Sequence, residues 1–187
     1  GYPILCSAFF VCFGMFQSYQ TSRENSDILY SVLLPVRKTD VVKAKFYVAV
    51  IFQMMAFALC SVFTIIRMEF LSENSVYGTN ALMSANFVFL AFVLIIFATF
   101  NLVFIGGFFR TAYNYGKPFI IFIILTFVII GIAEALHYLP GLGWLNSLGF
   151  DYLSGQMIVL ASAFVLYFAG TVIAYLASKK SFEKIDL

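Results

Sequence analysis

Five long apolar stretches alternate with shorter polar segments along the chain. The apolar stretches cover approximately residues 2–20, 46–66, 83–109, 118–138 and 154–177. Each is close to the roughly 20 residues that an α-helix needs to cross the hydrocarbon core of a bilayer. The pattern predicts an all-α membrane protein, a polytopic helical bundle with five spans. No linker interrupts it, so residues 1–187 are expected to form a single transmembrane domain.

Basic residues fall in alternate connections between these stretches. Of the 11 Lys and Arg residues, ten lie in the first connection, the third connection or the C-terminal tail, and Arg67 lies in the second. Short loops rich in Lys and Arg mark the cytoplasmic side of a membrane protein. We therefore expect the C-terminus to be cytoplasmic and Gly1 to lie outside.

Composition supports a membrane protein and argues against a nucleic-acid partner. Hydrophobic residues make up 63% of the chain and charged residues 11%, whereas soluble domains carry about 25% charged residues. The net charge of +2 is spread over small groups and forms no basic stripe. The lipid bilayer is the expected environment. No His, Cys and carboxylate cluster suggests a metal site.

Both ends of the pattern deviate from a simple series of spans. The chain opens at Gly1, without Met and without the positive flank of a signal peptide. If an earlier span with a cytoplasmic start precedes Gly1, then Gly1 lies outside as expected. This interpretation predicts six spans in the full protein. Near the other end, residues 139–153 are too short to span yet remain apolar, and aromatic anchors flank them. We expect a re-entrant or interfacial segment on the outer face.

The first polar connection, residues 22–45, has two parts. Its first half has an apolar helical face, and Pro35 ends the helix because the residue before a proline is disfavoured in helical geometry. In its second half, a new helix starts near Asp40 and enters the second span through basic residues. The first half contains Arg23, Glu24, Asp27, Ile28, Leu29, Val32 and Leu33, and the elbow and basic helix entrance contain Pro35, Arg37, Lys38, Asp40 and Lys43.

Two interpretations of this amphipathic helix remain open on the pattern alone. It could rest on the lipid surface, with its apolar face down and its cations on anionic headgroups. It could instead dock in a groove of a cytoplasmic protein.

The stretch LYSVLLPVRKTDVVKAKF resembles the corresponding loop in permease subunits of bacterial type-2 ABC exporters. The resemblance is closest to small permeases of Gram-positive bacteria, such as exporters of phenol-soluble modulins and other amphipathic peptides. It implies a plasma-membrane permease that pairs with a second copy of itself or a related half, each half resting on a separate ATPase subunit. Residues 24–33 would be the coupling helix. The matching positions are Leu29, Leu33, Pro35, Val36, Arg37, Lys38, Asp40, Val41, Lys43, Lys45 and Phe46.

No stretch resembles the phosphate-binding loop GxxxxGK[ST]. ATP and Mg²⁺ are therefore expected on the partner subunit, and this chain has no expected catalytic residue or cofactor. The cargo would be a hydrophobic or amphipathic peptide, lipid or drug-like molecule. The alternatives are a secondary carrier and a non-transporting scaffold, immunity or sensor subunit.

Polar residues inside the spans are further candidates for function. Glu134 lies about one turn from an outer end, with His137 on the same helix face. The pair would be either locally satisfied near the headgroups or an outer gate. The uncharged residues are expected to hydrogen-bond between helices. They are Gln17, Gln53, Asn86, Asn101 and Gln156.

Overall fold

The computed structural model describes residues 2–26, 30, 37–70, 85–111, 114–136, 138–147 and 150–184, and within these ranges it contains helices and no strand. A short 3₁₀ turn, η1 (Tyr2–Leu5), leads into α1 (Cys6–Glu24). Three further long helical units follow: α3 (Lys38–Phe70), the continuous run α5 (Phe87–Thr99), η3 (Phe100–Ile105) and α6 (Gly106–Arg110), and α7 (Gly116–Leu136). A second 3₁₀ turn, η4 (Gly143–Asn146), precedes the last helix, α8 (Leu153–Glu183).

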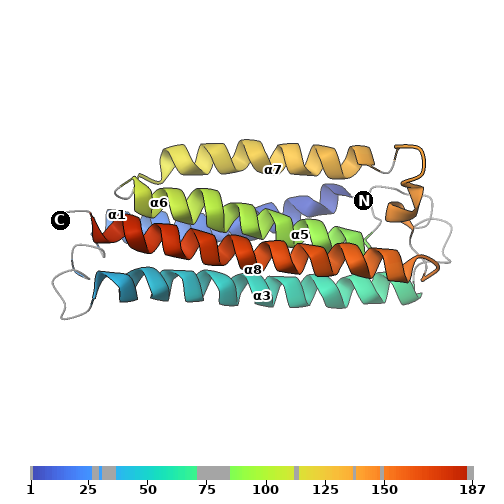
Figure 1. The fold of residues 1–187 in the computed structure, drawn as a ribbon, viewed down its shortest axis with the longest axis horizontal. Helices are drawn as coiled ribbons and strands as arrows, with labels where there is room; N and C mark the ends of the chain where they lie inside the picture. Colours follow the sequence, from blue (N-terminus) through green and yellow to red (C-terminus); the bar gives the residue numbers. More distant parts are fainter. Residues whose placement is uncertain are drawn as a thin grey trace.

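Successive long helices run in opposite directions (Figure 1). The end of α1, the start of α3, the α6–α7 connection and the end of α8 lie together at one end of the bundle, near the C-terminus. All ten cations assigned above to the cytoplasmic side belong to these four places. We call this the basic end, and we call the opposite end, which holds the start of α1, the outer end.

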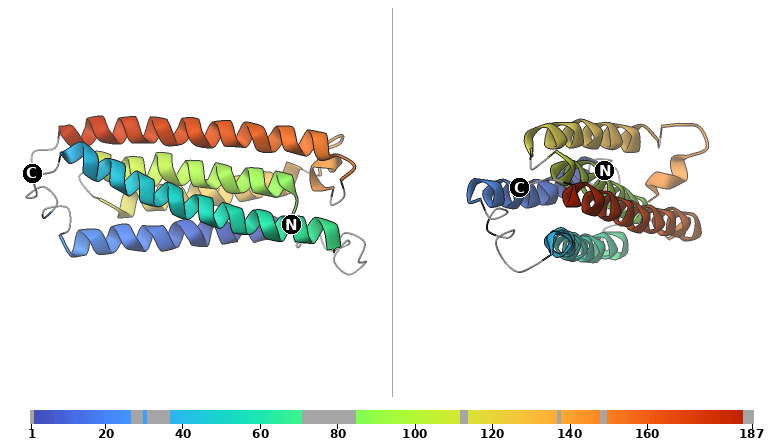
Figure 2. Two further views of the ribbon diagram at one scale, coloured as in Figure 1. Left: turned by 90° about the horizontal axis from the view of Figure 1, so that it is seen from below. Right: turned by 60° about the vertical axis from the view of Figure 1, so that its left-hand side comes forward.

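The run α5–η3–α6 is the centre of the bundle. Nine of the thirteen residues in α5 are buried, and Figures 1 and 2 show the other long helices arranged around this run. α8 follows it closely because Gly170 carries no side chain: a Cβ built there would lie 3.2 Å from Cδ1 of Leu102. Small residues permit such close approach between membrane helices.

Phenylalanines fill the space between α1, the central run and α7. The Phe16 and Phe119 rings stack with their centroids 3.7 Å apart, and the Phe104 ring lies 5.5 Å from Phe16. Aromatic pairs at such distances add a modest stabilisation to the effect of burial. This cluster attaches α1 and α7 to the centre by packing.

The outer faces of α3, α7 and α8 are apolar, as expected for contact with lipid. Large apolar side chains such as Phe63, Ile124 and Val165 are more than half exposed. Among the described residues, α3, α5–α6, α7 and α8 are long and apolar enough to span a membrane. The predicted first span falls on η1 and α1, whose later turns are polar at Gln17, Gln20 and beyond. A count of five spans therefore stays a prediction.

At the outer end, η4 is held to the long helices by hydrogen bonds. Asn86 caps α5 by accepting from the Phe89 N–H at 3.0 Å, and its Nδ2 donates to the carbonyls of Leu145 at 2.6 Å and Ser147 at 3.1 Å. Gln156 of α8 also donates to the Ser147 carbonyl, at 3.0 Å. These two buried amides attach η4 to α5 and α8. The predicted interfacial placement of residues 139–153 stays a prediction.

The close packing of α6 against α7 can be tested at Gly107. A Cβ at Gly107 would lie 2.8 Å from Cβ and 2.9 Å from Cγ of Pro118, and a proline ring cannot rotate away. We expect Gly107→Ala to lower the free energy of unfolding by about 1–3 kcal/mol, the usual range for overpacking. Loss of cooperative heat stability in detergent would report it.

Gly106→Ala is the matched control. Its Cβ would meet only the Asn101 carbonyl oxygen at 3.6 Å, an ordinary contact. Alanine is favoured over glycine inside a helix by roughly 0.5–1 kcal/mol. Gly106→Ala should therefore be neutral or stabilising. Equal melting temperatures for the two variants would contradict the close approach of Gly107 to Pro118.

Candidate functional site

The basic ends of α1 and α3 are joined by Lys45. Its Nζ donates to Oγ of buried Ser22 at 2.6 Å and lies 5.5 Å from the centre of the Tyr19 ring. The Tyr19 hydroxyl donates a long hydrogen bond of 3.5 Å to the Lys45 carbonyl. Since α1 ends at Glu24 and α3 begins at Lys38, Lys45 joins the two helices that flank the predicted coupling segment.

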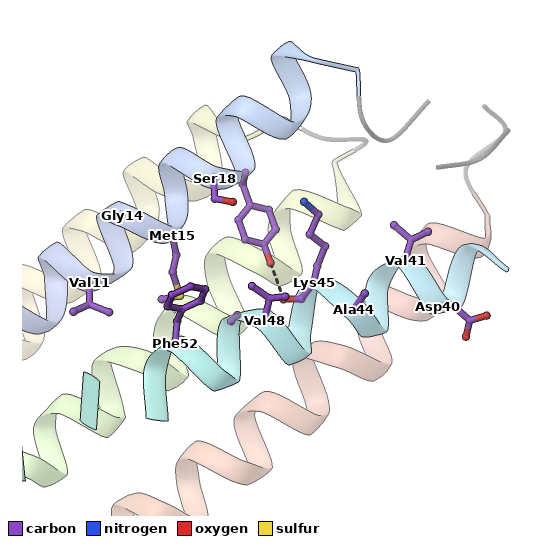
Figure 3. Close-up of a pocket in the computed structure, with 12 residues that line it drawn as sticks. Val11, Gly14, Met15, Ser18, Asp40, Val41, Ala44, Lys45, Val48 and Phe52 are labelled. Atoms are coloured by element: carbon purple, nitrogen blue, oxygen red, sulfur yellow. Dashed lines mark hydrogen bonds between the residues drawn. The ribbon is translucent and has the colours of Figure 1, made fainter. Parts of the chain in front are cut away.

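A groove lies between α1 and α3 and extends to both sides of Lys45 along α3 (Figure 3). It has a volume of about 700 Å³, within the roughly 300–1,000 Å³ typical of small-molecule sites. Most of its wall is apolar, and its polar groups lie towards the basic end. The lining residues are Val11, Gly14, Met15, Ser18 and Tyr19 from α1, and Asp40, Val41, Ala44, Lys45, Val48, Ala49 and Phe52 from α3.

Two features keep the groove open to the side. No atom of the described residues lies within 4 Å of a Cβ built on Gly14. On the facing helix, Val48 and Phe52 are 51% and 55% exposed although both line the groove. The groove is therefore open along one side, with largely apolar walls.

The predicted site residues are only partly within the described structure. Arg23 stands at the end of α1 with its guanidinium carbon 5.1 Å from the centre of the Tyr115 ring, and Glu24 accepts from Nε2 of Gln20 at 2.9 Å. Arg37 directly precedes α3, and the first turns of α3 contain Lys38, Asp40 and Lys43. The Lys43 amine lies 5.5 Å from the Tyr47 ring centre. Asp27, Ile28, Leu29, Val32, Leu33 and Pro35 lie outside the described residues.

The predicted outer gate is also described only in part. Glu134 is half-buried on α7, and its Oε2 has no hydrogen-bond partner among the described residues. His137 lies outside them. The gate hypothesis therefore stays a prediction.

A second polar site lies in the centre of the bundle. Gln53 of α3 and Asn101 of η3 exchange two amide hydrogen bonds, of 2.8 and 3.0 Å. Asn101 also donates to Oγ1 of Thr171 at 2.9 Å, and the Tyr167 hydroxyl donates to Oε1 of Gln53 at 2.7 Å. We call these four residues the central polar cluster. Gln53, Asn101 and Tyr167 are fully buried.

Asn101 belongs to a π-helical segment, since η3 has π geometry over Phe100–Ile105. Such segments are rare and often occur at functional sites. The sequence predicted interhelical hydrogen bonds for Gln53 and Asn101, and the structure confirms them. It did not indicate Tyr167 or Thr171, because a hydroxyl on a long apolar helix has no distinguishing pattern. The groove was also missed, although Gly14, Ala44 and Ala49 are small residues on the two facing helices.

Comparison with known proteins decides the family. Residues 2–183 match the family described as ABC-2 family transporter protein. The chain belongs to this family. No curated protein and no solved structure matches it.

Membership in the ABC-2 family places the basic end and the groove in a membrane component of a transporter. ABC-2 permeases are not themselves catalytic, and the family generally works with an ABC ATPase. The apolar helices described above agree with a multi-pass membrane protein and a permease subunit. The family match thus confirms the coarse part of the resemblance seen in the sequence, but not the modulin-exporter subgroup.

Proposed function

We propose that this chain is the permease subunit of an ATP-driven exporter in the bacterial plasma membrane, moving hydrophobic or amphipathic cargo out of the cell. Two copies would form the membrane domain on two ATPase subunits. The observation that carries the proposal is the collection of ten of the 11 Lys and Arg residues at one end of an ABC-2 family bundle. Under the positive-inside rule that end is cytoplasmic, which puts the C-terminus on the same side.

The coupling element would be the amphipathic helix at residues 24–33. Its two neighbours support this role, because α1 and α3 meet through Lys45, Ser22 and Tyr19 near the helix ends that flank this segment. A push on the segment between them would therefore reach both helices. A peptide exporter of the modulin type is the narrower cargo hypothesis, supported by the loop resemblance.

Copurification with an ATPase is the direct test. We expect the tagged permease, coexpressed with an ABC ATPase encoded beside it, to elute with that ATPase in a stable equimolar complex whose ATP hydrolysis rises when amphipathic cargo is added. Coexpression with an ATPase of an unrelated importer is the control. A permease that elutes without the ATPase under conditions that preserve its fold would contradict the proposal and favour a scaffold subunit.

A further inference from the structure

The central run of the bundle changes helix type where the central polar cluster attaches to it. η3 has π geometry over Phe100–Ile105, between the α-helical segments α5 and α6 (Figure 1). Hydrogen bonds in a π-helix span five residues instead of four, so a π turn holds more residues than the α turn it replaces. Helices also change direction at π turns. η3 is therefore the one place in this run where α5 and α6 are joined by a wider turn.

Leu102 occupies an unusual position in this wider turn. Within residues 85–109, all of which the structure describes, it is the only exposed residue, at 41%. Its neighbours Asn101 and Phe104 are fully buried. The Leu102 side chain lies over Gly170 of α8, where a built Cβ would be 3.2 Å from Leu102 Cδ1. The extra residue of the π turn is thus accommodated by an outward position of Leu102 over a glycine.

The π turn also keeps three phenylalanines on one side of the run. Phe100, Phe104 and Phe108 follow one another at intervals of four residues. Their rings contact aromatic rings of α7 and α1, namely Phe122, Phe16 and Tyr19. In an α-helix four residues turn by about 400°, so Phe108 would be rotated by about 80° from Phe100. A turn with more residues rotates less per residue and removes much of this drift.

Asn101 holds the π turn from the other side. Its fully buried amide exchanges hydrogen bonds of 2.8 and 3.0 Å with Gln53 of α3 and donates to Thr171 of α8 at 2.9 Å. Beyond η3 the run is attached at both ends: Asn86 binds η4 at the outer end, and Gly107 packs on Pro118 of α7 towards the basic end. The two attached halves of the run meet at η3.

We infer that η3 is a hinge of the permease and that Asn101 controls it. In the state described here, Asn101 is bonded to α3 and α8 and the turn is π. When the ATPase moves the basic end, these hydrogen bonds break, the turn at Leu102 tightens to α geometry, and α6 rotates relative to α5 together with the start of α7. The inference rests on the proposed function, because the ATPase supplies the movement.

A pair of deletions tests whether η3 holds an extra residue. Without Leu102, Phe108 would follow Phe100 by seven residues, so in a continuous α-helix the two rings would be only about 20° apart. The variant should therefore keep a cooperative melting transition in detergent, close to that of the parent. Deletion of Leu94, which is buried in α5, is the control. No π turn absorbs that loss, and the helix beyond it is turned by about 100°, so this variant should not elute as a folded protein.

Distances between spin labels test the movement. The three native cysteines are replaced by alanine, and the permease–ATPase complex is placed in lipid nanodiscs. One label pair, at Arg110 of α6 and Leu176 of α8, reports on the basic half of the bundle. The other pair, at Ile132 of α7 and Ile158 of α8, reports on the outer half. All four side chains are exposed.

The two label pairs should respond differently to nucleotide. On addition of a non-hydrolysable ATP analogue, we expect the distance in the basic half to change by more than the about 1–2 Å typical of helix shifts at interfaces. The distance in the outer half should stay the same. In the Leu102 deletion, the distance in the basic half should no longer respond to the analogue, because the turn is already α.

Four results would overturn the inference. An unchanged distance in the basic half would show that η3 does not move, and equal changes in both halves would show a rigid-body motion. A nucleotide response retained in the Leu102 deletion would show that the movement does not need the π turn. If the Leu102 deletion does not fold, deletion of the adjacent Val103 removes one residue from the same turn, and failure of both would show that no extra residue is present.

Absence of a copurified ATPase would instead overturn the proposed function. The deletions of Leu102 and Leu94 are compared in detergent without the ATPase, so they would still report on the extra residue in η3.

Discussion

Replacing Asn101 with leucine should destabilise this protein strongly. The substitution removes two hydrogen bonds to Gln53 and one to Thr171 and leaves a fully buried glutamine side chain without its amide partner. Hydrogen bonds between membrane helices contribute about 0.6 kcal/mol on average and up to about 1.7 kcal/mol each, so three should total on the order of 2–4 kcal/mol. Detergent-driven unfolding followed by helix content would measure this loss.

Thr99→Val is the control for Asn101→Leu. Thr99 lies two residues earlier, and within the described part of the chain its hydroxyl bonds only to the Ile95 carbonyl of its own helix, at 2.8 Å. The effect of Thr99→Val should be small, because no interhelical partner is affected. Equal loss of stability in the two variants would show that the central polar cluster does not hold the helices together.

A double substitution tests whether Gln53 and Asn101 stabilise the bundle as a hydrogen-bonded pair. Gln53→Leu with Asn101→Leu removes both amides at once, so neither is left without its partner. Replacing both members of a buried pair by apolar groups is often nearly neutral, whereas removing one leaves the other unsatisfied. The double variant should therefore be more stable than the sum of the single effects predicts. Strict additivity would contradict coupling between the two side chains.

Charged residues at Leu29 and Val32 should abolish cargo transport without preventing membrane insertion. Both positions belong to the apolar face predicted for residues 24–33, and an aspartate there cannot enter an apolar groove on an ATPase without a desolvation cost. The expected result for Leu29→Asp with Val32→Asp is a permease present at normal levels in the membrane. Its complex should hydrolyse ATP without a response to cargo.

Ser31→Asp provides the matched control for this coupling test. At 100° per residue, position 31 lies about 130° from the centre of the apolar face of the predicted helix, so an added charge there should leave cargo-stimulated hydrolysis and transport close to normal. Cargo export and ATP hydrolysis measured together in proteoliposomes would distinguish the variants. Normal coupling in the double aspartate variant would mean that the helix does not connect to the ATPase.

Helix positions could be predicted from the sequence because a bilayer imposes a simple length and polarity requirement. Four of the expected apolar stretches coincide with α3, α5–α6, α7 and α8. The grouping of cations at one end followed from the alternation of basic connections, since successive spans must reverse direction. The pairing of Gln53 with Asn101 was predicted only as a class of contact, because an amide in a span needs a partner but its pattern does not name one.

Only the tertiary structure showed which polar residues contact one another. Gln53, Asn101, Tyr167 and Thr171 are far apart in sequence and meet because α3 and α8 both pack on the central run, with Gly170 allowing close approach.

The same holds for the groove. α1 and α3 are each unremarkable as apolar helices, and the cavity between them depends on the small side chains where they face each other. The sequence by itself determined a membrane bundle, the positions of most of its helices and the direction of its charge asymmetry, because these follow from local hydrophobicity. Only helix packing decided which polar side chains form hydrogen bonds and where space remains for a ligand. Both depend on distances between residues that are far apart in the sequence.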